Sequence, residues 1–148
     1  HPERVYAVFP DGAQWTYGEL RQRVRRTARQ LQELGVRQGD TVLVWLPNGA
    51  DILRVWYAIN YIGAVYVPIN TAYRGRLLEH VVENSDAKLA IVHAGLAERL
   101  AEVGTARLEQ VVILQGEPRP VKDLKVHPAA ALERADDAVL ELEAPIRP

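Results

Sequence analysis

The hydrophobic pattern is clearest between Asp40 and Asn70, where two short apolar runs flank a helical stretch. Thr41–Leu46 and Ala64–Pro68 show little polar alternation, which is typical of strands buried on both faces of a parallel sheet. Gly63 stands where a glycine commonly ends a helix. The stretch therefore predicts a strand, a helix over residues 49–62 and a second strand, joined as a right-handed parallel crossover.

The central helix is apolar on nearly all sides, so we expect it to be covered on both sides. Asn48 is the expected N-cap, and Asp51 places a negative charge in the first turn. One group of side chains is expected to pack on the sheet of this chain: Val55, Trp56, Ile59 and Ile62. A second group is expected to face a missing subdomain or a partner chain: Leu53, Tyr57 and Tyr61.

The flanking segments extend this alternation of strands and helices. Residues 1–16 predict a β-hairpin, and Thr16 with Glu19 fits the capping box of a long helix that ends at Gly35. Further elements are predicted at residues 76–84 (helix), 88–93 (strand), 96–103 (helix) and 110–114 (strand). Residues 41–114 thus predict an α/β core, a doubly wound and mostly parallel sheet with helices on both faces. Residues 115–148 are expected to be an irregular tail with helical turns near 121–125 and 129–135, the whole being a single partial domain.

Composition and charge exclude several classes of function. The chain has 148 residues, 48% hydrophobic and 25% charged, with a formal net charge of −1, which gives no electrostatic case for nucleic acid. The arginines of the first helix are interpreted as a solvated face or a contact with another protein surface.

No cysteine is present, so disulfides and thiolate metal sites are excluded and a cytoplasmic location is the default expectation. No apolar run approaches the ~20 residues of a membrane span. Methionine is absent, so we expect the chain to be part of a larger protein.

Candidate chemistry is sought at the carboxyl ends of the strands, where open α/β sheets bind ligands. The chain has neither a GxGxxG turn nor a Walker A sequence. His93 and the pair Asp136–Asp137 are interpreted as loop residues, and the scattered histidines lack the spacing of a metal site. No catalytic residue is identified. The loop that carries Asn70, Tyr73 and Arg74 follows a buried strand and is the candidate site-adjacent loop.

Residues 15–92 carry a series of marks that together are similar to a known family. They are Thr16-Tyr17 with Glu19-Leu20, Gly35-Val36 with Gly39-Asp40, Leu46-Pro47-Asn48, Gly63-Ala64-Val65 with Val67-Pro68, Asn70, and Ser85 with Ala87-Lys88. In this order and spacing the sequence resembles the N-terminal part of the adenylate-forming (AMP-binding) acyl-CoA synthetases. Residues 67–74 are more similar to the fatty acyl or crotonobetaine/carnitine-CoA ligase branch than to luciferases.

The resemblance implies an ATP-dependent ligase that uses Mg²⁺ and coenzyme A. Such enzymes convert a carboxylic acid to an acyl-adenylate with release of pyrophosphate, and then pass the acyl group to the thiol of coenzyme A. The family's phosphate loop and lid lysine have no counterpart here, so we expect the chain alone to be inactive scaffold. The alternative is a stand-alone binding or interaction domain of flavodoxin-like shape. A homo-oligomer is left open.

Overall fold

The computed structural model describes residues 1–133. An antiparallel hairpin, β1 (Val5–Val8) and β2 (Gln14–Thr16), leads directly into the long helix α1 (Tyr17–Glu33). The predicted capping box is present: the Thr16 amide donates to Glu19 Oε2 at 2.8 Å, and the Glu19 amide donates to Thr16 Oγ1 at 3.2 Å. Two orphan amides at the start of α1 are thereby satisfied, which explains why the helix begins where the hairpin ends.

The core is a five-stranded sheet in the order β4-β3-β5-β6-β7, with every neighbouring pair parallel. Its strands are β3 (Thr41–Trp45), β4 (Val65–Pro68), β5 (Leu89–His93), β6 (Gln110–Leu114) and β7 (Lys125–His127). The predicted α/β class, a mostly parallel sheet with helices, is therefore confirmed.

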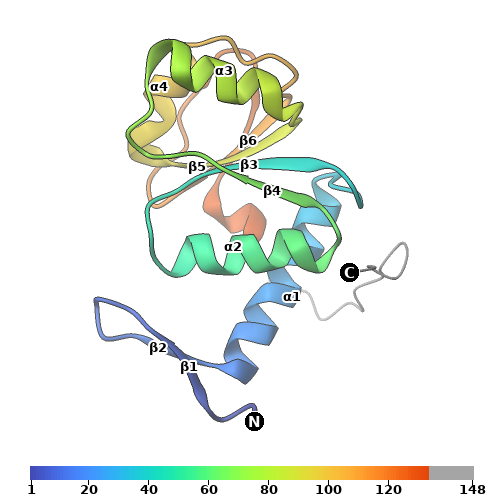
Figure 1. Ribbon diagram of the computed structural model, residues 1–148, viewed down its shortest axis with the longest axis vertical. Helices are drawn as coiled ribbons and strands as arrows, with labels where there is room; N and C mark the ends of the chain where they lie inside the picture. Colours follow the sequence, from blue (N-terminus) through green and yellow to red (C-terminus); the bar gives the residue numbers. More distant parts are fainter. Residues whose placement is uncertain (134–148) are drawn as a thin grey trace.

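Helices cover both faces of this sheet (Figure 1). α1 and α2 (Ala50–Tyr61) lie on one face, and α3 (Gly75–Ser85) and α4 (Ala97–Ala101) lie on the other. Alternate residues of the strands enter two separate cores: Val42 and Val44 join the core beneath α1 and α2, whereas Leu43 joins the core beneath α3 and α4. Burial on both faces explains why β3, β5 and β6 read as continuous apolar runs. The same burial was expected for β4, but β4 is an edge strand and its Val65 is 48% exposed. Within residues 1–133 no helix has both the length and the apolarity to span a membrane.

The segment after β6 is more ordered than the sequence predicted. Residues 115–148 were expected to be irregular, but Lys125–His127 forms β7 and pairs with β6 from Gln110↔Lys125 to Val112↔His127. The helical turn expected over residues 121–125 is instead a turn that leads into this strand. A three-residue strand with polar residues at both ends carries almost no periodicity, so only the neighbouring strand reveals it. A 3₁₀ helix, η2 (Ala129–Leu132), follows, and Asp136–Asp137 lies outside the described residues.

Two expectations for α2 were wrong. Gly49, not Asn48, is the N-cap, and it makes no side-chain cap hydrogen bond. Trp56 was expected in the core but is 41% exposed, whereas Val55 and Ile59 are fully buried. Residues 55, 58, 59 and 62 form the stripe that faces the sheet, and Trp56 lies about 100° away from residue 55 around the helix axis. An all-round apolar sequence does not reveal which stripe is turned inward.

Candidate functional site

The strand order places a topological switch point between the carboxyl ends of β3 and β5. The chain leaves β3 toward β4 on one side and leaves β5 toward β6 on the other, so the two loops diverge. Open α/β sheets bind ligands at such a switch point. The loop at Leu46–Gly49 follows β3 and the turn at His93–Gly95 follows β5, and His93 Nδ1 accepts a hydrogen bond from the Gly95 amide at 3.0 Å. His93 is the last residue of β5 and not a loop residue as expected, and its ring nitrogen stabilises the turn that follows the strand.

The predicted loop with Asn70, Tyr73 and Arg74 lies beyond the edge strand β4, one strand away from the switch point. The Asn70 backbone oxygen accepts hydrogen bonds from Trp45 Nε1 at 3.0 Å and from the Tyr73 amide at 3.1 Å. Asn70 Oδ1 accepts from the Ala72 amide at 2.9 Å. Asn70 therefore shapes the loop and fixes it to the end of β3. Tyr73 is half-buried against the core beneath α3 and α4.

Arg74 is the exposed member of this loop and the N-cap of α3. Its guanidinium has no ion-pair or hydrogen-bond partner within residues 1–133. The loop is braced from the other side by Arg99, whose Nη1 donates to the Thr71 backbone oxygen at 2.7 Å. The loop is fixed and carries one unpaired cation. Of the three predicted site residues, Arg74 is therefore the one whose side chain is available to bind an anionic group.

A buried polar network at the start of α2 was not predicted. Arg54 is 8% exposed, and its Nε donates to Asp51 Oδ1 at 2.8 Å. Its Nη1 donates to Thr27 Oγ1 at 3.2 Å and to the Leu132 backbone oxygen at 3.4 Å. The other oxygen of Asp51 accepts from Gln115 Nε2 at 2.9 Å. One buried guanidinium thus links α1, α2 and η2, and through Asp51 it reaches the loop after β6.

The loops that follow β3, β5 and β6 contain glycines with specific backbone or packing requirements. Gly49 has a φ of 154°, a conformation that favours glycine, although a Cβ there would meet nothing within 4 Å. A Cβ on Gly116 would lie 2.5 Å from the Ala94 Cβ, so the loops after β5 and β6 touch. Within the described part of the chain, no group of three or more His, Asp or Glu side chains could hold a metal ion.

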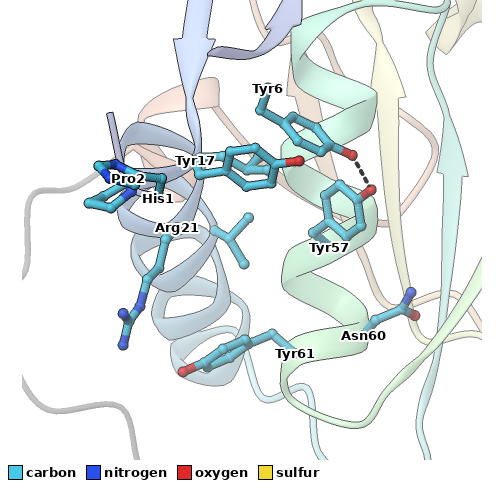
Figure 2. A pocket seen from close by; sticks show the side chains of 11 residues that line it. His1, Pro2, Tyr6, Tyr17, Arg21, Tyr57, Asn60 and Tyr61 are labelled. Atoms are coloured by element: carbon cyan, nitrogen blue, oxygen red, sulfur yellow. Dashed lines mark hydrogen bonds between the residues drawn. The ribbon is translucent and has the colours of Figure 1, made fainter. Parts of the chain in front are cut away.

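A hollow away from the strand ends lies between the hairpin, α1 and α2 (Figure 2). We call it the aromatic groove; its volume is about 820 Å³. Four tyrosines dominate its wall: Tyr6 from β1, Tyr17 from α1, and Tyr57 and Tyr61 from α2. Figure 2 shows the rings of Tyr6, Tyr17 and Tyr57 gathered at one end, with Tyr61 and the Arg21 side chain at the other.

A hydrogen bond between two tyrosine hydroxyls connects β1 to α2 across the groove. Tyr6 Oη and Tyr57 Oη lie 2.5 Å apart, and the Tyr6 ring meets the Tyr17 and Tyr57 rings edge-on, with centroids 5.0 Å and 6.2 Å away. The hydrogen bond to Tyr57, burial and the neighbouring phenol all raise the pKa of Tyr6. The Tyr6 hydroxyl therefore stays neutral near pH 7. Tyr57 was expected to face a missing partner, but the hairpin of this chain already half-covers it.

These features define an α/β scaffold with a topological switch point at its strand ends and, in its sequence, no phosphate-binding loop. The sequence model of the AMP-binding enzyme family matches residues 1–145. The chain therefore belongs to the AMP-binding enzyme family, as the resemblance in the sequence predicted.

Known relatives agree with this assignment. The chain is 34% identical over 131 residues to a feruloyl-CoA synthase of Amycolatopsis, which covers 88% of this chain and 23% of the relative. It is 30% identical over 112 residues to the crotonobetaine/carnitine–CoA ligase of Salmonella paratyphi A, covering 74% and 22%. The crystal structure of a Brucella canis acyl-CoA synthetase superposes with a TM-score of 0.79 at 24% identity, over 94% of this chain and 26% of that one, and so supports the fold. The chain spans about a fifth of the length of the curated relatives that it matches.

Proposed function

We propose that this chain is the N-terminal α/β part of an ATP-dependent acyl-CoA synthetase. The proposed reaction joins a carboxylic acid to AMP with release of pyrophosphate, and then transfers the acyl group from the adenylate to coenzyme A with release of AMP. The observation that carries the proposal is the match of residues 1–145 to the AMP-binding enzyme family. Relatives named as CoA ligases support the acid–thiol ligase class.

In this proposal the chain supplies scaffold, and the nucleotide site lies in sequence that it does not contain. ATP phosphates need a cradle of backbone amides and a cation, and Mg²⁺ needs a set of oxygen ligands. The sequence has no glycine-rich phosphate loop, and residues 1–133 hold no metal-binding cluster. We infer that Asn70, Tyr73 and Arg74 border the site of the complete enzyme, and that the enzyme is cytoplasmic.

Reading the gene downstream of the codon for Pro148 tests the proposal first. We expect a Ser/Thr/Gly-rich loop that ends in Pro-Lys within about 30 codons, by the motif logic of phosphate loops. Immediate termination would favour the alternative, a stand-alone flavodoxin-like binding domain.

ATP–pyrophosphate exchange with a panel of carboxylic acids tests the chemistry. The complete polypeptide should exchange label with at least one acid, and the 148-residue chain should stay at background. Exchange by the chain alone would contradict the inference that the nucleotide site lies elsewhere, because nothing described here could stabilise a transferring adenylyl group.

A further inference from the structure

A hollow of about 440 Å³ lies where the end of the hairpin, α1, the start of α2 and η2 meet. Three arginines line it, Arg23 and Arg26 from α1 and Arg54 from α2, and we call it the arginine pocket. It shares no lining residue with the aromatic groove, and the proposed function gives it no role. Its volume lies within the range of about 300–1,000 Å³ that is typical of small-molecule sites.

The two carboxylates that line the arginine pocket are both engaged by Arg54. Asp51 Oδ1 accepts from Arg54 Nε at 2.8 Å, and the other Asp51 oxygen accepts from Gln115. Glu133 Oε1 lies 3.6 Å from Arg54 Nη2. Arg54 therefore supplies no free charge to the pocket, and its two acidic partners are paired with it and not with the other two arginines.

Arg23 and Arg26 are the unpaired cations of the pocket. They are three positions apart on α1 and are thus neighbours on one face of the helix. Neither guanidinium forms an ion pair or a hydrogen bond within residues 1–133. The Arg23 guanidinium carbon lies 4.6 Å from the centroid of the Trp15 ring, and this cation–π contact holds the side chain while it uses none of the N–H donors. Two neighbouring guanidiniums without partners favour an anionic ligand.

The start of α2 adds positive potential to the same wall. Ala50 is the first residue of α2 and lines the pocket, and the N-cap Gly49 offers no side chain to the free amides of the first turn. A helix N-terminus carries a partial positive charge. This charge adds to the field of Arg23 and Arg26, which remain the main donors.

We propose that the arginine pocket is a phosphate-binding site, for inorganic phosphate or for the phosphate group of a small molecule. Each guanidinium presents a planar fork of N–H donors, so Arg23 and Arg26 together match the several oxygens and the double charge of a phosphate better than they match a single carboxylate. Both side chains donate to the phosphate oxygens, and the start of α2 lies beside them. The pocket has neither a glycine-rich loop nor a lysine, so it is not the nucleotide site of the proposed function, and its test does not depend on that function.

Titration of the 148-residue chain with sodium phosphate, followed by ¹H–¹⁵N NMR, tests the proposal. Sodium acetate at the same ionic strength is the comparison, because it supplies a monovalent carboxylate. We expect the Trp15 indole N–H and the Ala50 amide to shift and to saturate at millimolar phosphate, with at least about tenfold weaker binding of acetate. The Leu77 amide on α3, at the other face of the sheet, should not shift.

A parallel titration with glycerol phosphate distinguishes the two sources of the phosphate group. Tighter binding than that of inorganic phosphate assigns the pocket to a phosphorylated small molecule, and equal or weaker binding assigns it to inorganic phosphate.

Substitutions on α1 locate the binding. Arg23→Gln and Arg26→Gln should each weaken phosphate binding about tenfold, since each removes charged donors from the pocket. Arg25→Gln removes the same charge from the same helix, but Arg25 is exposed and outside the pocket, so binding should weaken less than about twofold. Spectra of the phosphate-free variants that are unchanged away from the substituted residue show that the variants fold. The absence of saturable shifts, an equal response to acetate, or an equal loss in Arg25→Gln would overturn the proposal.

Discussion

At the scale of single residues, the buried Arg54 shows how a charge can organise an α/β scaffold. A buried guanidinium is costly unless its donors are bonded, and Arg54 meets this condition with Asp51, Thr27 and the Leu132 backbone oxygen. Because these partners come from three different elements, the residue fixes the relative position of α1, α2 and η2. In the sequence, Arg54 is only a polar position on an apolar helix.

The environment of His127 predicts that the free energy of unfolding depends on pH. Its Nε2 lies 2.8 Å from Gln110 Oε1, and burial, followed by the positive charge of Lys125, lowers its pKa. As the pH falls through about 6.5, His127 is therefore protonated in the unfolded chain before it is protonated in the folded chain. The free energy of unfolding therefore falls as the pH drops below the unfolded-state pKa, and this loss stops below the folded-state pKa.

Urea melts between pH 8 and pH 5 of the chain and of His127→Gln measure this contribution. Glutamine can keep a hydrogen bond to Gln110 but does not titrate, so we expect a smaller loss of stability with acid in the variant. The other titrating groups contribute to both proteins, and the difference between the two curves isolates residue 127. Parallel curves would show that the pKa of His127 is the same in the folded and unfolded chain.

At the scale of elements, α2 combines a buried stripe with an aromatic outer side. Ile59 is fully buried against the sheet, whereas Trp56 stacks on Tyr57 and Tyr66 with ring centroids 5.2 Å and 5.7 Å away. The outer side is therefore a surface stack and not a core. Burial also raises the pKa of Tyr66, so the Tyr66 hydroxyl carries no charge near neutral pH.

This arrangement predicts unequal costs for two truncations in α2. Ile59→Ala should lower the free energy of unfolding by about 2–5 kcal/mol, as expected for a buried aliphatic side chain. Trp56→Ala should lower it by only about 1 kcal/mol, because it removes an aromatic stack and little buried area. Denaturant melts of both variants provide the measurement. A larger loss for Trp56→Ala than for Ile59→Ala would restore the sequence-based expectation that Trp56 belongs to the core.

At the scale of the whole molecule, one sheet serves two cores. Val44 and Ile91 enter the core beneath α1 and α2, and their neighbours Leu43 and Val92 enter the core beneath α3 and α4. Loss of either core would expose the apolar side chains on one face of the same strands to water. The two layers should therefore unfold together, although they share few side chains.

Ile59→Ala and Leu78→Ala test this coupling from opposite faces. Both side chains are fully buried, one on α2 and the other on α3. We expect each variant to shift one common unfolding transition, followed both by tryptophan fluorescence and by circular dichroism. Two separate transitions in either variant would show that the layers unfold independently.

The sequence by itself determined the elements whose pattern is local. The capping box fixes the start of α1, and the apolar runs at β3, β5 and β6 predict strands buried on both faces, hence a parallel α/β sheet. It also placed Asn70 and Arg74 in a strand-end loop. These features depend on neighbours in the chain, so they can be read without the fold.

Tertiary structure alone decided the features that depend on distant partners. The strand β7 exists through its pairing with β6, and the side of α2 turned inward is set by the sheet beneath it. Arg54 meets Thr27 and Leu132 across 27 and 78 positions of sequence, and Tyr6 meets Tyr57 across 51. No local period encodes such contacts, because they are selected by how the layers pack, and the aromatic groove is made of them.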